Sequence, residues 1–277
     1  MSLRARRPPL SAAAVLQARR RLQHGQPDPA AFPDWWLRHR TVCASTEREL
    51  EAWLTVVPPQ SARSAAFAPR AVLASRQRFG KGQRGRPWQS PAGGVWLSAA
   101  LPWALPPPRG AAVGLAVAVG LALELEALGL TVQLKWPNDL LVEGRKIAGL
   151  LPRLRLRGEQ VRWAQVGVGL NGINPVPPGA ISVATALAAT QPSWRGSAAA
   201  RATSPAGLAA RLLRGLDWAA THALAPGRVL RQARQRLLLP AAPVLHGGVA
   251  WQAVDLATDG SLVLQRGAER TLLQRRF

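Results

Sequence analysis

The sequence is poor in several residue types, and each shortage excludes a class of protein. Cys43 is the single cysteine among 277 residues, which excludes a disulfide framework and a cysteine-rich zinc module. The four histidines are scattered along the chain and suggest no metal cluster. The longest apolar stretch, Ala111 to Leu123, is shorter than the roughly 18 residues that a membrane-spanning helix needs. Since we also find no signal peptide, we expect a cytoplasmic protein without membrane association.

Acidic residues are scarce as well. The chain has 36 Lys and Arg against 14 Asp and Glu, which gives a formal net charge of +22. A strongly basic surface is typical of nucleic-acid-binding proteins because it attracts phosphates. However, almost all of these cations are arginine, tyrosine is absent, and tryptophan and proline are abundant. The charge therefore also fits a genome-wide drift toward Arg, Ala and Pro, or an acidic protein partner.

The few lysines and asparagines that remain are concentrated in one region. All three lysines fall between residues 81 and 146, and all three asparagines fall between residues 138 and 174. A lysine ammonium is a compact charge that a planar guanidinium does not replace. This clustering indicates that the region carries the chemistry of the protein.

The apolar pattern predicts alternating helices and strands, with Ser45 or Thr46 as the N-cap of one helix. The other expected helices are 11–22, 111–128, 208–224 and 229–238, and the expected strands are 71–75, 95–101, 132–135, 140–142, 146–156 and 161–170. Residues 184–206 are rich in Ala, Ser and Thr, and we expect a loop there.

Three units are expected along the chain. Residues 1–40 are a weakly ordered basic extension, too short for a DNA-reading winged helix. Residues 41–240 form an α+β catalytic domain. Residues 241–277 contain four short strands with the spacing of a small β-barrel.

The segment Gly80 to Arg86 is a glycine-rich basic loop. Its glycines let the backbone approach a ligand, and Lys81, Arg84 and Arg86 add positive charge. The residue order of a P-loop is absent. The loop predicts binding of a phosphate or a carboxylate, and a solvated basic hairpin tip is the alternative.

A second block runs from Lys135 to Asp139 and is followed by Lys146. Pro137 ends the expected strand and leaves Asn138 and Asp139 exposed at its end. A carboxylate there can hold a magnesium ion or a cationic nucleophile, whereas the alternative is an ordinary surface ion pair. The concentration of scarce residues favours function.

The third block, Gly167 to Asn171, ends the last expected strand of the catalytic domain. Alternating glycines permit close approach of a flat ligand, and Asn171 offers the donor and acceptor that an adenine edge requires. A tightly packed strand is the alternative.

The three blocks, in this order and spacing, resemble those of the bacterial biotin protein ligases, the biotin–[acetyl-CoA carboxylase] ligases. The resemblance covers about residues 41–277, and the matching stretches are Ser45–Thr46, Gln77 to Trp88, Lys135 to Val142, Arg145 to Leu150, and Gly167 to Asn171. It implies a class II synthetase-like biotin/lipoate ligase fold, which is a mixed β-sheet with helices packed on one side, plus a small C-terminal SH3-like β-barrel. It also implies the catalytic-only class without an N-terminal DNA-binding domain, and hence no specific DNA partner.

The resemblance implies a two-step ligation. Biotin and ATP, with Mg²⁺, give biotinyl-5′-AMP and pyrophosphate, and a lysine of the acidic biotin carboxyl carrier protein of acetyl-CoA carboxylase then attacks the mixed anhydride. The first step brings two anions together, so cations must screen them. Whether the protein is a monomer or a homodimer stays open.

The resemblance also assigns roles to named residues. The catalytic set is Lys146, Lys81, Asp139 and Lys135, with Asp139 also the candidate ligand of Mg²⁺. The biotin-binding set is Ser45, Thr46, Glu47, Gln77, Lys81, Gly82, Gln83, Trp88 and Lys146, and the ATP- or adenylate-binding set is Arg84, Arg86, Asn138 and Asn171. Two positions depart from the family, because Glu47 stands where Asn is usual and Lys81 where Arg is common.

Three other functions compete with biotin ligation. Lipoate or octanoate ligation uses a related fold, but the block from Lys135 to Asp139 favours biotin. A basic nucleic-acid-binding protein explains the charge and leaves the clustering of lysine and asparagine unexplained. An inactive homologue is the third alternative, suggested by Glu47 and Lys81.

Overall fold

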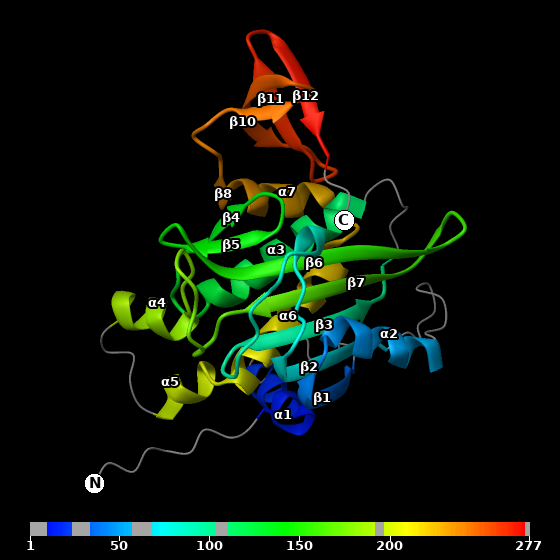
Figure 1. Cartoon of the computed structure of the whole chain (residues 1–277), viewed down its shortest axis with the longest axis vertical. Coiled ribbons are helices and arrows are strands. Elements are labelled where there is room, and N and C mark those ends of the chain that lie inside the picture. The colour runs from blue at the N-terminus through cyan, green and yellow to red at the C-terminus, as the bar shows by residue number, and fades with distance from the viewer. Residues whose placement is uncertain (1–9, 24–33, 57–67, 104–109, 192–196, 275–277) are drawn as a thin grey trace.

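The computed structural model describes residues 10–23, 34–56, 68–103, 110–191 and 197–274 (Figure 1). They form a large β-sheet with helices packed against it and a small second sheet at the C-terminal end of the chain. Figure 1 shows the small sheet at one end of the molecule, beside helix α7.

The large sheet is mixed, as expected. Its eight strands follow the order β1-β2-β3-β7-β6-β5-β4-β8, and the pairs β1–β2 and β4–β8 are parallel while the other pairs are antiparallel. The strands are β1 (Trp36–Cys43), β2 (Arg70–Gln77), β3 (Val95–Leu101), β4 (Gln133–Lys135), β5 (Asp139–Val142), β6 (Arg145–Arg157), β7 (Gln160–Leu170) and β8 (Leu237–Leu238).

Three helices cover one face of this sheet: α1 (Ala12–Gln23), α3 (Gly110–Glu126) and α6 (Pro205–His222). Alternate strand residues, such as Val95, Leu97 and Leu101 of β3, point into the core that these helices close. Helices α3 and α6 cross closely at two glycines. A Cβ on Gly120 would lie 2.1 Å from the carbonyl oxygen of Gly215, so a side chain there would separate the helices.

The opposite face carries helix α2 (Thr46–Val56), which lies in front of the sheet in Figure 1. Its residues Leu50, Trp53 and Leu54 pack on Val72 of β2, and also on Ala100 and Trp163. The expectation that all helices pack on one side is therefore wrong for α2. An exposed stretch of this face remains beside the helix, and the candidate site lies there.

The N-terminal segment is part of the main fold. Helix α1 packs on α6, where Arg19 donates to Asp217 over 2.9 Å, and the indole N–H of Trp35 reaches the same carboxylate at 2.8 Å. The expected boundary at residue 40 falls within β1. The described residues before it form a helix and part of a strand, and not a weakly ordered extension. Residues 1–9 and 24–33 of that expected extension lie outside the described ranges.

Between residues 183 and 202 the structure has two helices where a loop was expected, α4 (Val183–Thr190) and α5 (Ser197–Ala202). The physical reason is the alanine content, since alanine has the highest helix propensity. Ser182 is the N-cap of α4, and its side chain accepts from the backbone N–H of Thr185 at 3.1 Å.

The remaining expected elements agree with the structure to within a few residues, as β3 shows by matching 95–101 without a shift. One further difference concerns the expected helix 229–238. Helix α7 (Pro226–Arg234) ends earlier, and the last two residues of that range form the edge strand β8. No helix in the described ranges is long and apolar enough to cross a membrane.

The C-terminal sheet contains β9 (Val244–His246), β10 (Val249–Leu256), β11 (Leu262–Arg266) and β12 (Glu269–Leu273), antiparallel in the order β12-β11-β10-β9. Within the described part of the chain β9 and β12 do not pair, so a closed SH3-like barrel is not confirmed. Polar contacts and a shared hydrophobic core tie this sheet to the main fold. Arg234 of α7 binds Asp255 through two nitrogens, and the indole N–H of Trp136 donates to the Gly260 carbonyl at 2.9 Å.

Candidate functional site

A cavity of about 370 Å³ lies on the α2 face of the large sheet. It is bounded by the N-terminus of α2, the loop after β2 and the strands β5, β6 and β7. Most residues that the sequence singled out are brought together in its lining: Ser45, Thr46, Glu47, Gln77, Lys81, Gly82, Gln83, Arg86, Trp88, Asn138, Asp139, Lys146 and Asn171.

Two of the expected site residues do not line the cavity. Lys135 lies on β4 with an exposed side chain, although its backbone pairs with that of Asp139. Arg84 is exposed in the short 3-10 turn Gln83–Gly85, with φ near 57°. Both lie beside cavity residues in the chain, but their own side chains are placed elsewhere.

A neutral hydrogen-bonding cluster occupies the part of the cavity over β2 and β3, and it consists of Ser45, Thr46, Gln77 and Ser98. The Gln77 side-chain carbonyl accepts from the backbone N–H and the hydroxyl of Thr46, at 2.8 and 3.1 Å. The Thr46 and Ser98 hydroxyls lie 2.9 Å apart. The cluster presents donors and acceptors without net charge, so it suits a neutral polar group of a ligand.

The cations of the cavity lie on other elements. Lys146, near the start of β6, forms an ion pair with Asp139 of β5, and its Nζ lies 2.6 Å from Oδ1. Lys81 and Arg86 come from the loop after β2. Strands β5 and β6 are separated from β2 and β3 by β7, so Lys146 and the neutral cluster sit on different parts of the cavity floor. A ligand with a polar ring and a distant anionic group fits this arrangement.

The Trp88 ring forms one wall of the cavity and packs closely against two strand glycines. A Cβ on Gly169 would come within 2.5 Å of this ring, and one on Gly149 within 2.9 Å. The Lys146 ammonium lies 4.9 Å from the ring centroid, at a cation–π distance. The flat group beside Gly169 is therefore, in this structure, a side chain of the protein, whereas the atoms nearest a Cβ on Gly167 belong to Leu151.

The loop from Gly80 to Arg86 is a tight turn. The N–H of Gly82 donates to the carbonyl of Arg86 at 2.8 Å, and the turn passes through Arg84 and Gly85 in left-handed conformation. Its tip is exposed while Lys81, Gln83 and Arg86 contribute to the lining. The loop thus combines the two alternatives, a solvated hairpin tip and a basic wall.

The two asparagines of the lining also hold strand ends together. Asn138 donates through Nδ2 to the carbonyl of Leu150 at 2.7 Å. Asn171 is buried, and its Oδ1 accepts from Asn174 at 3.3 Å. Part of the hydrogen-bonding capacity of both amides is therefore used inside the protein.

Sequence reasoning missed the loop after β7. Pro177 and Ala180 line the cavity, and the backbone of the loop pairs with Lys146. The Lys146 N–H donates to the Gly179 carbonyl at 2.9 Å, which fixes the start of β6. Prolines and alanines carry no catalytic chemistry, so only the proline cluster at 175–178 marked this loop as irregular.

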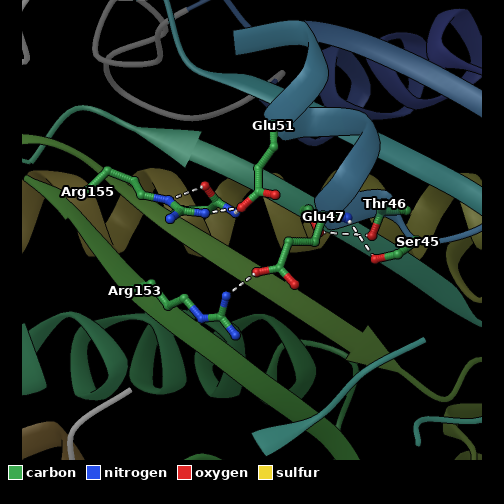
Figure 2. A network of polar contacts seen from close by, with 8 residues as sticks. Ser45, Thr46, Glu47, Glu51, Arg153 and Arg155 are labelled. Atoms are coloured by element: carbon green, nitrogen blue, oxygen red, sulfur yellow. Dashed lines mark hydrogen bonds and ion pairs between the residues drawn. The ribbon is translucent and has the colours of Figure 1, made fainter. Parts of the chain in front are cut away.

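Glu47 forms an ion pair with an arginine that lies outside the cavity lining. Figure 2 shows Glu47 and Glu51 reaching from α2 toward β6, where Arg153 and Arg155 reach back. The Arg153 Nη1 lies 2.8 Å from the Glu47 Oε1, and Arg155 forms an ion pair with Glu51. These arginines were not expected as part of the site.

Carboxylates that could hold a metal ion are few. Within the described ranges no group of three or more His, Cys, Asp and Glu side chains is arranged to bind a metal. Asp139 and Glu47 are the acidic residues of the lining, and each is already paired with a cation. A divalent ion at Asp139 would therefore need further ligands from a bound substrate.

A second hollow of about 820 Å³ adjoins the cavity and is more open. The two share Gln77, Gln89 and Pro177 in their linings. Arg76 and Arg78 also line the hollow; both are exposed, and neither makes an ion pair with another described residue. The surface at this side of the cavity is therefore cationic.

Comparison with known proteins identifies the fold and the central segment. Residues 60–171 match the biotin/lipoate A/B protein ligase family. Over 108 residues the chain is 35% identical to the bifunctional ligase/repressor BirA of Bacillus subtilis, covering 38% of this chain and 33% of that protein. Over 117 residues it is 38% identical to a biotin–[acetyl-CoA-carboxylase] ligase of Paracoccus denitrificans, covering 40% and 47%. The matched region thus spans between a third and half of these curated relatives.

Solved structures extend the likeness to most of the chain. The biotin protein ligase of Aquifex aeolicus in complex with biotin and ATP aligns with a TM-score of 0.64 at 18% identity, covering 86% of this chain and 95% of that one. The biotin acetyl coenzyme A carboxylase synthetase of Helicobacter pylori aligns with a TM-score of 0.56 at 20% identity, covering 86% and 100%. The resemblance to the biotin protein ligases is therefore confirmed: residues 60–171 match the biotin/lipoate A/B protein ligase family, and the chain has the fold of the biotin protein ligases.

Proposed function

We propose that this protein is a biotin protein ligase, which activates biotin with ATP and transfers it to a lysine of the biotin carboxyl carrier protein of acetyl-CoA carboxylase. The observation that carries the proposal is a single cavity with a neutral hydrogen-bonding cluster on one part of its floor and cations on another. Biotin has a polar ureido ring at one end and a carboxylate at the other, so it matches both.

The neutral cluster also favours biotin over lipoate. The ureido ring offers a carbonyl acceptor and two N–H donors, which Ser45, Thr46 and Gln77 can satisfy. The dithiolane ring of lipoate offers no such groups, so it would displace water from these polar side chains without replacing the hydrogen bonds of that water, which is costly. Trp88 supplies the apolar wall that the remainder of either ligand requires.

In the first step a carboxylate oxygen of biotin attacks the α-phosphorus of ATP, which forms the acyl–phosphate bond and releases pyrophosphate. Lys81, Arg86 and Lys146 supply the positive charge that this encounter of two anions needs. Mg²⁺ usually binds one or two protein carboxylates together with substrate phosphates, so Asp139 fits as its ligand on the protein side. When bound, the ion would neutralise phosphate charge.

In the second step the amine of the carrier lysine attacks the acyl carbon. A carbon–nitrogen bond forms, the bond to the phosphate oxygen of AMP breaks, and the amine loses a proton. Asp139 lies beside Lys146, where a carboxylate can orient the incoming ammonium and accept its proton. The loop from Gly80 to Arg86 borders the cavity and would limit hydrolysis of the adenylate by water.

We assign binding of the nucleotide to Asn138, Asn171 and Arg86. Asn171 and Asn138 line the cavity, which supports a role in adenine or adenylate binding. The exposed positions of Arg84 and Lys135 give no support to a direct role in the cavity.

We assign docking of the carrier domain to the cationic hollow beside the cavity. A lysine on a folded carrier domain can reach the adenylate only if that domain sits against the cavity, and Gln77, Gln89 and Pro177 belong to both hollows. The exposed Arg76 and Arg78 favour a carrier with an acidic surface, since complementary charge steers association.

Intact-mass analysis of an acidic biotin carboxyl carrier domain tests the function. Incubated with this protein, biotin, magnesium and ATP, the domain should gain one biotinyl group, and it should gain none without ATP. Addition of lipoyl groups in place of biotinyl groups would favour lipoate ligation. Failure to add either, with no biotin binding, would refute the proposal.

A further inference from the structure

Two parallel ion pairs connect α2 with β6, and they differ in their position relative to the cavity. Glu47 and Glu51 lie four residues apart on one helix face, and their partners Arg153 and Arg155 lie two residues apart on one strand face (Figure 2). Both pairs hold α2 on the sheet. The Glu47 pair lies at the cavity, whereas the Glu51 pair lies beyond it.

The two carboxylates also differ in how exposed they are. Glu47 belongs to the cavity lining and its side chain is 19% exposed, whereas the Glu51 side chain is 43% exposed and outside the lining. Glu51 also accepts from Gln165, through the same Oε1 that binds Arg155, so the two carboxylates differ in their place relative to the cavity and not in how many oxygens are bound. Glu47 makes a hydrogen bond through Oε1 to Arg153, and its Oε2 has no hydrogen-bond partner among the described residues.

Glu47 therefore keeps one carboxylate oxygen, Oε2, available to a ligand in the cavity that it lines. Its backbone N–H donates to the Ser45 hydroxyl at 3.2 Å, so the two residues occupy the same turn at the start of α2. A carboxylate can only accept hydrogen bonds, and it binds donors more strongly than a neutral amide does. A ligand group at this position must offer an N–H or an O–H.

We propose that Glu47 is a specificity-determining residue, whose Oε2 accepts a hydrogen bond from a ring N–H of the ligand. We further propose that Arg153 is a positioning residue that orients this carboxylate and cancels its charge. The inference rests on the proposed function, since the ureido ring of biotin has two N–H donors and no charge.

The charge of Arg153 determines which donor is preferred. With Arg153 in place, Glu47 and its partner are neutral together, so a neutral ring N–H is accepted without an excess of charge in the cavity. Without Arg153, an uncompensated carboxylate faces the ligand, and a partly buried carboxylate favours a cationic donor. Specificity for the neutral urea therefore depends on a residue that does not line the cavity.

The test compares binding of biotin with binding of its cyclic guanidine analogue, 2-iminobiotin, whose ring is cationic at neutral pH. The measured quantity is the ratio of the two affinities, obtained by titration calorimetry without ATP. Arg153→Met should shift this ratio toward the cation by roughly tenfold or more, which corresponds to one charge-assisted hydrogen bond. Glu47→Gln should shift it in the opposite direction.

The second ion pair provides matched controls. Arg155→Met and Glu51→Gln remove equivalent groups from the same helix and strand, and they should leave the ratio unchanged. In the double variant with Glu47→Gln and Arg153→Met, the effect of losing Arg153 should disappear, because the carboxylate that it neutralises is gone. This non-additivity separates a charge effect from general loosening of α2.

Two outcomes would overturn the inference. If the wild-type protein binds biotin and Arg153→Met shifts the ratio no further than Arg155→Met, Glu47 does not contact the ring, and the proposed function is unaffected. If the wild-type protein does not bind biotin, the proposed function fails and this inference fails with it.

Discussion

Replacing Arg19 by methionine should destabilise the whole main domain. The Arg19 guanidinium binds the Asp217 carboxylate of α6 at 2.9 Å, and the two side chains are only 6% and 3% exposed. The indole N–H of Trp35 donates to the other oxygen of Asp217 at 2.8 Å. Arg19→Met leaves this carboxylate buried without the cation that binds it.

The expected loss follows from the burial of the pair. Removing one partner of a buried ion pair costs about 3–5 kcal/mol, because the remaining charge loses its compensation. Trp35 still donates to Asp217, and Arg214 supplies a second positive charge nearby, so we expect about 3 kcal/mol. For a domain of this size, that corresponds to a decrease in Tm of about 6–12 °C.

The loss should also depend on pH. Burial raises the pKa of Asp217, against the charge and hydrogen bond of Arg19, which lower it. The folded protein therefore keeps the proton on Asp217 at pH values where the unfolded chain has released it, and the free energy of unfolding falls as the pH rises through that window. Without Arg19 the folded pKa rises further, so Arg19→Met should destabilise more at about pH 7 than at about pH 5.

Urea denaturation followed by tryptophan fluorescence at both pH values measures the effect. Arg40→Met is the control, because it removes an exposed partner of Glu49, and such pairs contribute less than about 1 kcal/mol. Equal losses for Arg19→Met and Arg40→Met, or a loss for Arg19→Met that ignores pH, would refute the reasoning.

Three further changes address the site itself. Lys146→Ala should slow biotin-dependent pyrophosphate release by about 2.7–4 kcal/mol of lost charge stabilisation, and near-normal release would contradict that role. Gly169→Ala would place a Cβ within 2.5 Å of the Trp88 ring, so the biotin affinity measured by calorimetry should change. Gly167→Ala is the control, because its Cβ would meet atoms no closer than 3.4 Å. The double variant Arg76→Glu and Arg78→Glu should raise KM for the carrier domain in a salt-dependent way and leave pyrophosphate release unchanged; an unchanged KM would exclude the adjoining hollow as the docking surface.

Much of the cavity could be predicted from the sequence because its lining comes in short contiguous blocks. The stretch from Gln77 to Trp88 supplies seven lining residues, and Asp139 and Lys146 lie on one hairpin. Residue types of restricted chemistry, such as lysine in an arginine-rich chain, mark these blocks without any knowledge of the fold. Lys135 shows the limit of such marking, since its exposed side chain is not part of the lining although its cross-strand partner Asp139 is.

Other features depend on contacts that no local pattern encodes. Arg153 is 106 residues from Glu47 in the sequence, and Arg19 is 198 residues from Asp217. In a chain with so many arginines, the few that meet a buried or cavity-lining acid cannot be distinguished before the fold is known. The helices between residues 183 and 202 were missed for another reason, because an Ala- and Ser-rich composition is typical of both loops and helices.

The hydrogen bond from Trp136 to the Gly260 carbonyl spans 124 residues of sequence and joins two parts of the chain that are easily regarded as interchangeable modules. Trp136 precedes Asn138 and Asp139 by only a few bonds, so the turn at the end of β10 helps to set the position of cavity-lining residues that it never contacts. A chimera that exchanges the C-terminal sheet between proteins of this fold would therefore inherit the arrangement of its cavity partly from the donor of that sheet. The design requirement for such an exchange is that the backbone carbonyl of Gly260 keeps its position.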